Sequence, residues 1–142
     1  MGFLFHDDGE SWGLQCLFSA QQTVSTTYAL GLCSDTLVEA DRIADILNEP
    51  TGGGYSRQLV VGSVQDFTIT KTDPSWTAAM DAVAWTASGA NIGTVDRWFF
   101  TNEAVSGSLG GSAFLLASGD IDPERTVNDG DTLNLTAYLT LK

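Results

Sequence analysis

Carboxylates are the most frequent groups in this chain that could perform chemistry, and one regular set lies near its end. From Asp120 to Asp131 oxygen ligands occur at alternating positions, as in part of a calcium-binding loop. Arg125, however, stands where the EF-hand requires glycine for its sharp turn, and no bidentate glutamate closes the loop. We therefore expect a solvated loop followed by a β-turn from Asn128 to Asp131, with no metal ligands.

The single histidine, His6, decides whether a nucleophilic mechanism is available. A serine or cysteine nucleophile needs a base that a third group holds in place. His6 lies in an N-terminal stretch that we expect to form a tail, and the chain has no Gly-x-Ser-x-Gly elbow. Cys16 and Cys33 lack C-x-x-C spacing, and we expect them to be reduced and buried unless the chain is secreted. We predict no catalytic residue.

Aromatic residues and acids together could still suggest sugar chemistry. Trp76, Trp85 and Trp98 could line a sugar cleft, but tryptophans at strand spacing are more often part of a core. With so many acids, some pair will have the separation of a glycosidase by chance. The chain has no P-loop, dinucleotide fingerprint or zinc ligand set, so no cofactor is predicted.

Charge and hydropathy exclude several classes of partner. The chain has 142 residues, a formal net charge of −12 and only six basic residues, which are scattered singly. Because a phosphate backbone or an anionic bilayer needs clustered Lys and Arg, we expect no nucleic-acid partner and no membrane partner. The chain has no run of about 18 apolar residues, so we expect no transmembrane helix. The N-terminus lacks the features of a secretory signal.

The elements that would position these residues are mainly strands. Alternating or apolar segments are separated by Gly, Ser, Asn and Asp loops, a pattern typical of antiparallel sheets. The expected strands are 26–33, 57–63, 67–72, one within 76–87, 95–101, 113–118 and 133–141. The sequence therefore predicts an all-β fold, an antiparallel, jelly-roll-like β-sandwich formed by a single domain from 21 to 142.

Two segments do not fit this strand pattern. Residues 1–20 predict an arm or short helix, because Leu14, Leu17 and Phe18 recur at helical spacing near Trp12, and Asp8 could cap the helix. The acidic segment from 35 to 49 is compatible with a short helix or with an ordered loop.

Several motifs resemble small virion structural proteins of tailed bacteriophages. Gly53-Gly54-Tyr55-Ser56-Arg57 resembles their G-G-x-Y-x-R segment, and the stretch from Trp85 to Phe100 resembles their aromatic strand after a gap. The segment from Gly111 to Leu133 is similar to their ending, T-V-x-x-G-D-x-L. The resemblance extends from Gly52 to the end, implies a structural role in the virion and brings no catalytic residues.

The resemblance leaves the location within the virion open. Because the chain is small and acidic, has no catalytic set and begins with an apolar segment able to dock, our first hypothesis is a capsid decoration (cement) protein on the outer surface of the phage head, bound to the major capsid protein or other virion proteins. We expect a homo-oligomer, for example a trimer, with apolar contacts. Phe3, Leu4, Phe5 and Trp12 are the candidate partner-binding anchors of the N-terminal arm, and packing within the same chain is the alternative for that arm. The alternative function is a tail or fibre protein that binds a host receptor or glycan through the loops 88–94 and 102–112.

Overall fold

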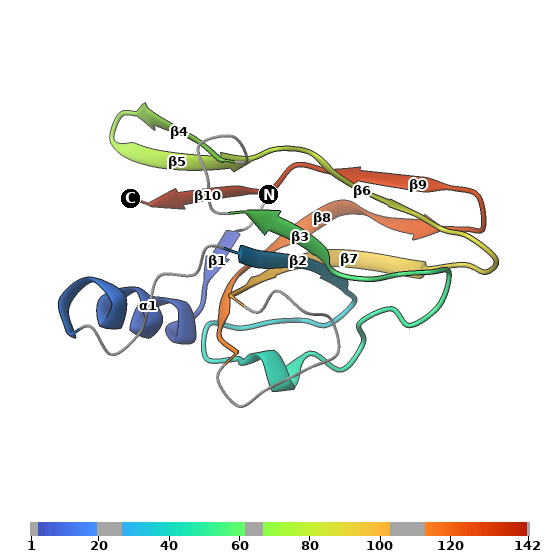
Figure 1. Cartoon of the computed structure of the whole chain (residues 1–142), viewed down its shortest axis with the longest axis horizontal. Helices are drawn as coiled ribbons and strands as arrows, with labels where there is room; N and C mark the ends of the chain where they lie inside the picture. The colour runs from blue at the N-terminus through green and yellow to red at the C-terminus, as the bar shows by residue number, and fades with distance from the viewer. Residues whose placement is uncertain (1–2, 20–26, 62–66, 103–112, 142) are drawn as a thin grey trace.

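The computed structural model describes residues 3–19, 27–61, 67–102 and 113–141 (Figure 1). The strands are β1 (Phe3–Phe5), β2 (Thr27–Cys33), β3 (Gln58–Val61), β4 (Phe67–Thr72), β5 (Ser75–Met80), β6 (Val83–Thr86), β7 (Gly93–Thr101), β8 (Leu115–Val127), β9 (Thr132–Leu135) and β10 (Tyr138–Leu141). The helices are α1 (Asp7–Leu14), the π-helical η1 (Gln15–Ser19) and the 3₁₀-helical η2 (Ile43–Asp45). None of the helices in these ranges is long and apolar enough to cross a membrane.

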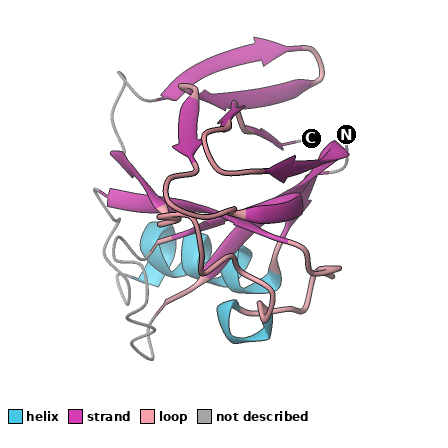
Figure 2. Cartoon of the chain, turned by 90° about the vertical axis from the view of Figure 1, so that its right-hand side faces the viewer, coloured by secondary structure: helices cyan, strands magenta, loops and turns pink. Residues whose placement is uncertain are grey.

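The strands form a sandwich of antiparallel sheets. One layer is a five-stranded sheet in the order β1-β8-β7-β2-β3. Two smaller sheets, β10-β5-β4 and β6-β9, lie over one face of it (Figures 1 and 2). The expected all-β, sandwich-like fold with a short N-terminal helix is confirmed.

Alternation along the central strands gives the large sheet two buried faces. Leu30 and Leu32 of β2 point towards the smaller sheets and belong to the main core, together with Trp85, Trp98 and the other residues of that cluster. The opposite face carries Cys33 and Phe99, which pack against Leu37 and Ile43 of the loop 34–49. The loop therefore covers the second face of the sheet, as a further layer would.

Two aromatic rings lie over glycines of neighbouring strands. Phe99 of β7 pairs with Gly31 of β2, and Trp98 of β7 pairs with Gly119 of β8. A Cβ added at either glycine would collide with the opposite ring. Because successive residues of a strand point to opposite faces, one ring–glycine pair stabilises each face of the sheet.

The N-terminal segment is built differently from the expectation. Phe3–Phe5 forms an edge strand on β8, which the sequence did not indicate, and the helix starts at Asp7 with His6, not Asp8, in the N-cap position. The predicted apolar face is wrong: Leu14, Leu17 and Phe18 are 60%, 74% and 81% exposed. Gly9 allows the opposite side of α1 to approach the sheet, because a Cβ at this position would collide with the backbone of Leu116.

The acidic segment from 35 to 49 is an ordered loop that contains only the short η2 helix. Of the two alternatives, a short helix or an ordered loop, the ordered loop is therefore confirmed. Its ends are tied together, since the Ser34 amide donates to the Asn48 carbonyl at 3.3 Å. The Asn48 side chain donates to Asp35 at 2.7 Å. These bonds position the loop over Cys33 and Phe99.

The expected solvated loop after residue 118 is wrong, because β8 continues to Val127. Asp120 lies within this strand and forms an ion pair of 2.6 Å with Arg97 of β7. Cross-strand hydrogen bonding extends the pairing beyond this point, as between Thr94 and Thr126 at 2.8 Å. The turn from Asn128 to Asp131 is confirmed by an amide-to-carbonyl bond of 2.9 Å and by a left-handed Gly130.

Candidate functional site

An apolar cleft opens at the end of the sandwich where α1 lies, between the large sheet and the β4–β5 hairpin. Its volume is about 390 Å³. The lining residues are Phe5, Gly9, Trp12, Gly13, Tyr28, Phe67, Ile69, Trp76, Thr77, Ala78, Phe100, Leu116 and Leu139. Cavities of this size with a lining of mainly apolar and aromatic residues are the usual form of a binding site.

Strand pairing places the aromatic residues on the walls. Phe100 of β7 is one residue before the end of that strand and stacks on Tyr28 of β2, with centroids 5.1 Å apart and planes 23° apart. Phe67 of β4 meets Phe100 edge to face at 6.2 Å. Trp12 meets Tyr28 in the same way at 6.2 Å. These geometries are favourable for aromatic pairs and hold the walls rigid.

Small residues keep the cleft open. Ala78 of β5 lies opposite Ile69 of β4 and Leu139 of β10, so the middle strand contributes little volume at this level. On the other wall, Gly9 and Gly13 of α1 carry no side chain. A larger residue at Ala78 or a side chain at Gly13 would reduce the cleft, as Trp85 fills the other end of the sandwich.

The lining contains no charged residue, although the chain carries a charge of −12. The Thr77 hydroxyl lies within hydrogen-bond distance of the Thr140 hydroxyl at 3.2 Å, and burial raises the pKa of the Tyr28 hydroxyl. Two large side chains reach the solvent at the mouth of the cleft, because Ile69 is 60% and Trp76 is 52% exposed. An exposed aliphatic side chain and an exposed aromatic side chain beside an uncharged lining suit the burial of an apolar group from another molecule.

The candidate anchors of the sequence analysis fall in three places. Phe5 and Trp12 line the cleft and pack against the main core. Leu4 is half-buried within β1, opposite Ser118. The backbone of Phe3 pairs with Gly119, while its side chain lies outside the described part of the structure. Phe5 and Trp12 therefore take part in intramolecular packing and also line the cleft.

Sequence reasoning missed most of this site. Tyr28 and Phe100 were expected in strands, but nothing in their spacing showed that they would meet. The signal that could have been used is the alternation in β4 and β5, which places Phe67 and Ile69 on one face and Trp76 on the same face of the neighbouring strand.

We expected His6 to lie on a tail, but the structure buries it completely. Its Nε2 lies 2.9 Å from the hydroxyl of Ser118, and its Nδ1 lies 3.2 Å from the carbonyl oxygen of Glu39. Burial is the main cause that lowers its pKa. The pair resembles a base and nucleophile in distance only, since neither side chain is exposed to a substrate. Its evident role is to tie β1 and the loop 34–49 to β8.

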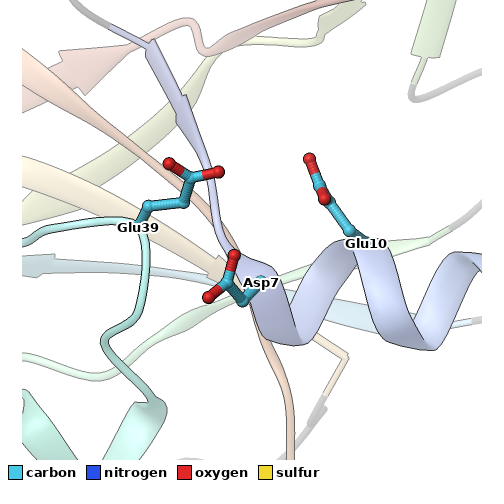
Figure 3. A group of neighbouring side chains, drawn as sticks. All are labelled: Asp7, Glu10 and Glu39. Carbon is cyan, nitrogen blue, oxygen red and sulfur yellow. The ribbon is translucent and has the colours of Figure 1, made fainter.

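Three carboxylates, those of Asp7, Glu10 and Glu39, have oxygens within 4.8 Å of one another (Figure 3). Asp7 and Glu10 belong to the first turn of α1, where the helix dipole stabilises negative charge. All three residues are exposed, and water solvates such groups without a metal. We assign no metal site to them.

The glycine motif of the resemblance builds a scaffold. Gly53 and Gly54 adopt φ of 63° and 70°, which side-chain-bearing residues rarely adopt. They lead to Tyr55, whose hydroxyl accepts from the Leu32 amide at 2.8 Å and donates to Glu49 at 2.9 Å. Arg57 binds both oxygens of Glu49 at 2.8 Å. The Tyr55 and Arg57 side chains thus join the acidic loop to β2.

Receptor binding by the loops 88–94 and 102–112 stays a prediction, and the structure describes only the first of them in full. The loop 88–94 packs on the glycine turn, since the Ser88 amide donates to the Gly53 carbonyl at 3.0 Å and Ile92 is buried. The Asn91 side chain accepts from the Asp129 amide at 2.8 Å. Nearly all of the loop 102–112 lies outside the described residues, so its binding role stays a prediction.

Both cysteines are free thiols, and burial raises the pKa of Cys33 to about 12. Comparison of the chain with family models, with curated protein sequences and with solved structures gave no match.

Proposed function

We propose that this chain is a structural subunit of a bacteriophage virion, a capsid decoration protein that binds neighbouring capsid proteins on the outer surface of the head. The observation that carries the proposal is the uncharged aromatic cleft with Ile69 and Trp76 exposed at its mouth. Such a surface is suited to bury apolar side chains of a protein neighbour. The motif resemblance supplies the virion context.

The distribution of charge supports contact through the cleft. The acidic loop 34–49, the first turn of α1 and the stretch from Asp120 to Asp131 hold most of the described acids. In the three-stranded sheet that forms one wall of the cleft, Lys71 is the only charged residue within the strands β4, β5 and β10. The cleft is therefore a neutral part of an acidic molecule, which suits it to contact with a protein neighbour.

The alternative, a tail or fibre protein that binds a glycan, receives less support from the cleft. Sugars are recognised by several polar groups arranged around an aromatic platform, whereas the side chains of this lining are apolar or aromatic except for Thr77. A homo-oligomer is compatible with the same cleft, provided that the apolar contact outweighs repulsion between the acidic subunits.

The experiment that tests the virion role is electron microscopy of intact particles labelled with an antibody against the chain. Label on heads supports the proposal, label on tails favours the alternative, and absence of label from particles overturns both.

The role of the cleft is tested by rebinding of the purified chain to heads that lack it. Trp76→Ser should abolish rebinding, because it removes the aromatic group at the mouth. Tyr138→Ser is the matched control, since Tyr138 is 48% exposed on β10 of the same sheet but does not line the cleft. Equal rebinding by both variants would show that the cleft is not the contact.

A further inference from the structure

A second unpartnered surface lies on the side of α1 that faces away from the cleft. Gly9, Trp12 and Gly13 line the cleft, whereas Asp7, Glu10, Leu14 and Phe18 recur at intervals of three or four residues. Residues at this spacing share one side of a helix. We call Asp7, Glu10, Leu14, Leu17, Phe18 and the adjacent Glu39 the outer helix face.

The outer helix face has an apolar half that the described residues leave uncovered. Leu14, Leu17 and Phe18 are 60%, 74% and 81% exposed, and Phe18 is the most exposed large hydrophobic residue among those described. Scattered apolar residues are normal on a surface, but three neighbours within one helical turn or so form a patch. Such i, i+3 and i+4 spacing is the form in which one helix presents anchors to another protein.

The other half is acidic and lacks cations of its own. The oxygens of Asp7, Glu10 and Glu39 lie within 4.8 Å of one another (Figure 3), and none of the ion pairs among the described residues involves them. Arg42, a cation of the same acidic loop as Glu39, pairs with Asp8 at 3.6 Å. Three like charges at this separation repel one another, and a cation from outside would relieve that repulsion.

We propose that the outer helix face binds a segment of a partner protein that carries Lys or Arg beside apolar side chains. The cations would lie over the acidic half and the apolar side chains against Leu14, Leu17 and Phe18. At a rise of about 1.5 Å per residue, the face extends roughly 16 Å from Asp7 to Phe18, so the bound segment must extend over about the same length.

Charge selects this occupant over a second copy of the chain. A second copy brings a net charge of −12, and four of its six basic residues are already in ion pairs, with Asp8, Glu49, Asp73 and Asp120. It would therefore add repulsion next to the acidic half. The same acids disfavour an anionic lipid surface.

The test is selection of helical 16-residue peptides from a randomised display library on the full-length chain. The selected peptides should be enriched in Lys or Arg together with Leu or Phe. Their affinity should fall about tenfold or more with Phe18→Ser, as for loss of a central aromatic anchor. Glu10→Lys should weaken them by a similar factor, and raised salt should weaken them further.

Matched controls are available on other surfaces. Leu47→Ser removes an apolar side chain that is 80% exposed in the acidic loop, and Glu124→Lys reverses an exposed charge in β8. Both should leave peptide affinity unchanged. The inference would be overturned if Phe18→Ser and Glu10→Lys left the affinity of the selected peptides unchanged. It would also be overturned if the library yielded no enriched peptide with both basic and apolar residues.

The inference does not rest on the proposed function, and the two fail separately. Peptides that respond to Trp76→Ser but not to Phe18→Ser occupy the cleft, which supports the cleft as a contact and overturns the outer helix face. A dimer that light scattering detects and Phe18→Ser abolishes, or flotation with neutral vesicles that Phe18→Ser abolishes, would assign the face to a second copy or to lipid instead.

Discussion

The two ends of the sandwich differ in what fills the space between the sheets. At the β6–β9 end, Trp85 is 2% exposed, its indole donates to the Ser56 carbonyl at 2.9 Å, and Val95, Val127 and Leu133 surround the same core. At the β4–β5 end, alanine and glycine face the gap and an open cleft of about 390 Å³ results. The comparison separates a part that stabilises the protein from a part that is free to bind.

The acidic loop 34–49 belongs, with the filled β6–β9 end, to what we call the closed part of the protein, in which buried side chains fill the space between the layers. Its contacts cover the second face of the large sheet, and the Glu49 carboxylate joins Tyr55 to Arg57. The Arg57 guanidinium also lies 5.0 Å above the ring of Phe99. A buried charged network of this kind must stay complete, because removal of one partner leaves the other desolvated.

The largest effect should come from the closed end. Trp85→Ala should lower the free energy of unfolding by about 3–5 kcal/mol, through the cavity left behind and the loss of the Ser56 bond. Urea denaturation followed by circular dichroism measures it. Trp85→Phe, which keeps most of the volume, should cost clearly less. A small loss for Trp85→Ala would mean that this end is not the rigid part.

Glu49→Ala should cost about 3 kcal/mol, since it leaves the Arg57 guanidinium buried without the carboxylate that binds it. The Arg57 side chain is only 4% exposed. Glu39→Ala removes an exposed acid from the same loop and should cost about 0.5 kcal/mol or less. Equal losses from both substitutions would contradict the assignment of the loop to the closed part.

His6 adds a pH dependence to the closed part. Burial lowers its pKa, against the opposing effects of the Glu39 and Val38 carbonyls and of Asp41, while Arg97 lowers it further. Because the unfolded chain then binds the proton more strongly, stability is lost as the pH falls below the ordinary value of 6.5. The loss is at most about 1.4 kcal/mol per pH unit for one proton. Unfolding free energies measured between about pH 7 and pH 5 should show this slope.

In His6→Gln the slope should be reduced, because the amide can keep hydrogen bonds to Ser118 and Glu39 without taking up a proton. An unchanged slope would assign the pH dependence to the carboxylates alone.

The smallest effect on stability should come from the open end. Trp76→Ala removes a tryptophan that is 52% exposed, so it should cost about 1 kcal/mol or less. The same denaturation experiment measures it beside Trp85→Ala. A loss as large as that of Trp85→Ala would show that the cleft is part of the stabilising core and would remove the contrast between the two ends.

Several elements could be predicted because their signals are local. The alternation in 26–33 and 67–72 and the turn from Asn128 to Asp131 depend on neighbours in sequence, and the structure confirms them. Other segments could not be predicted because their state depends on distant partners. His6 is buried by Ser118 and Glu39, and Phe3–Phe5 becomes a strand because β8 offers a free edge.

The helix illustrates the same limit. Its apolar spacing indicated that Leu14, Leu17 and Phe18 would pack inwards, yet glycine at position 9 allows the backbone of α1 to approach Leu116, and the opposite side becomes the buried one. Hydrophobic periodicity considers only the positions of apolar side chains. A helix can also pack closely on a strand at a glycine, where no side chain separates the two backbones.

The sequence by itself determined the class of this protein: an acidic, antiparallel β fold with Gly-rich turns and no recognisable catalytic motif. Those properties follow from composition and from short-range conformational preferences. Only the tertiary structure decided which aromatic residues meet, which end of the sandwich stays open and which side of α1 faces solvent. The physical reason is that a cleft is formed by side-chain volumes from several strands and one helix, and no single segment carries that information.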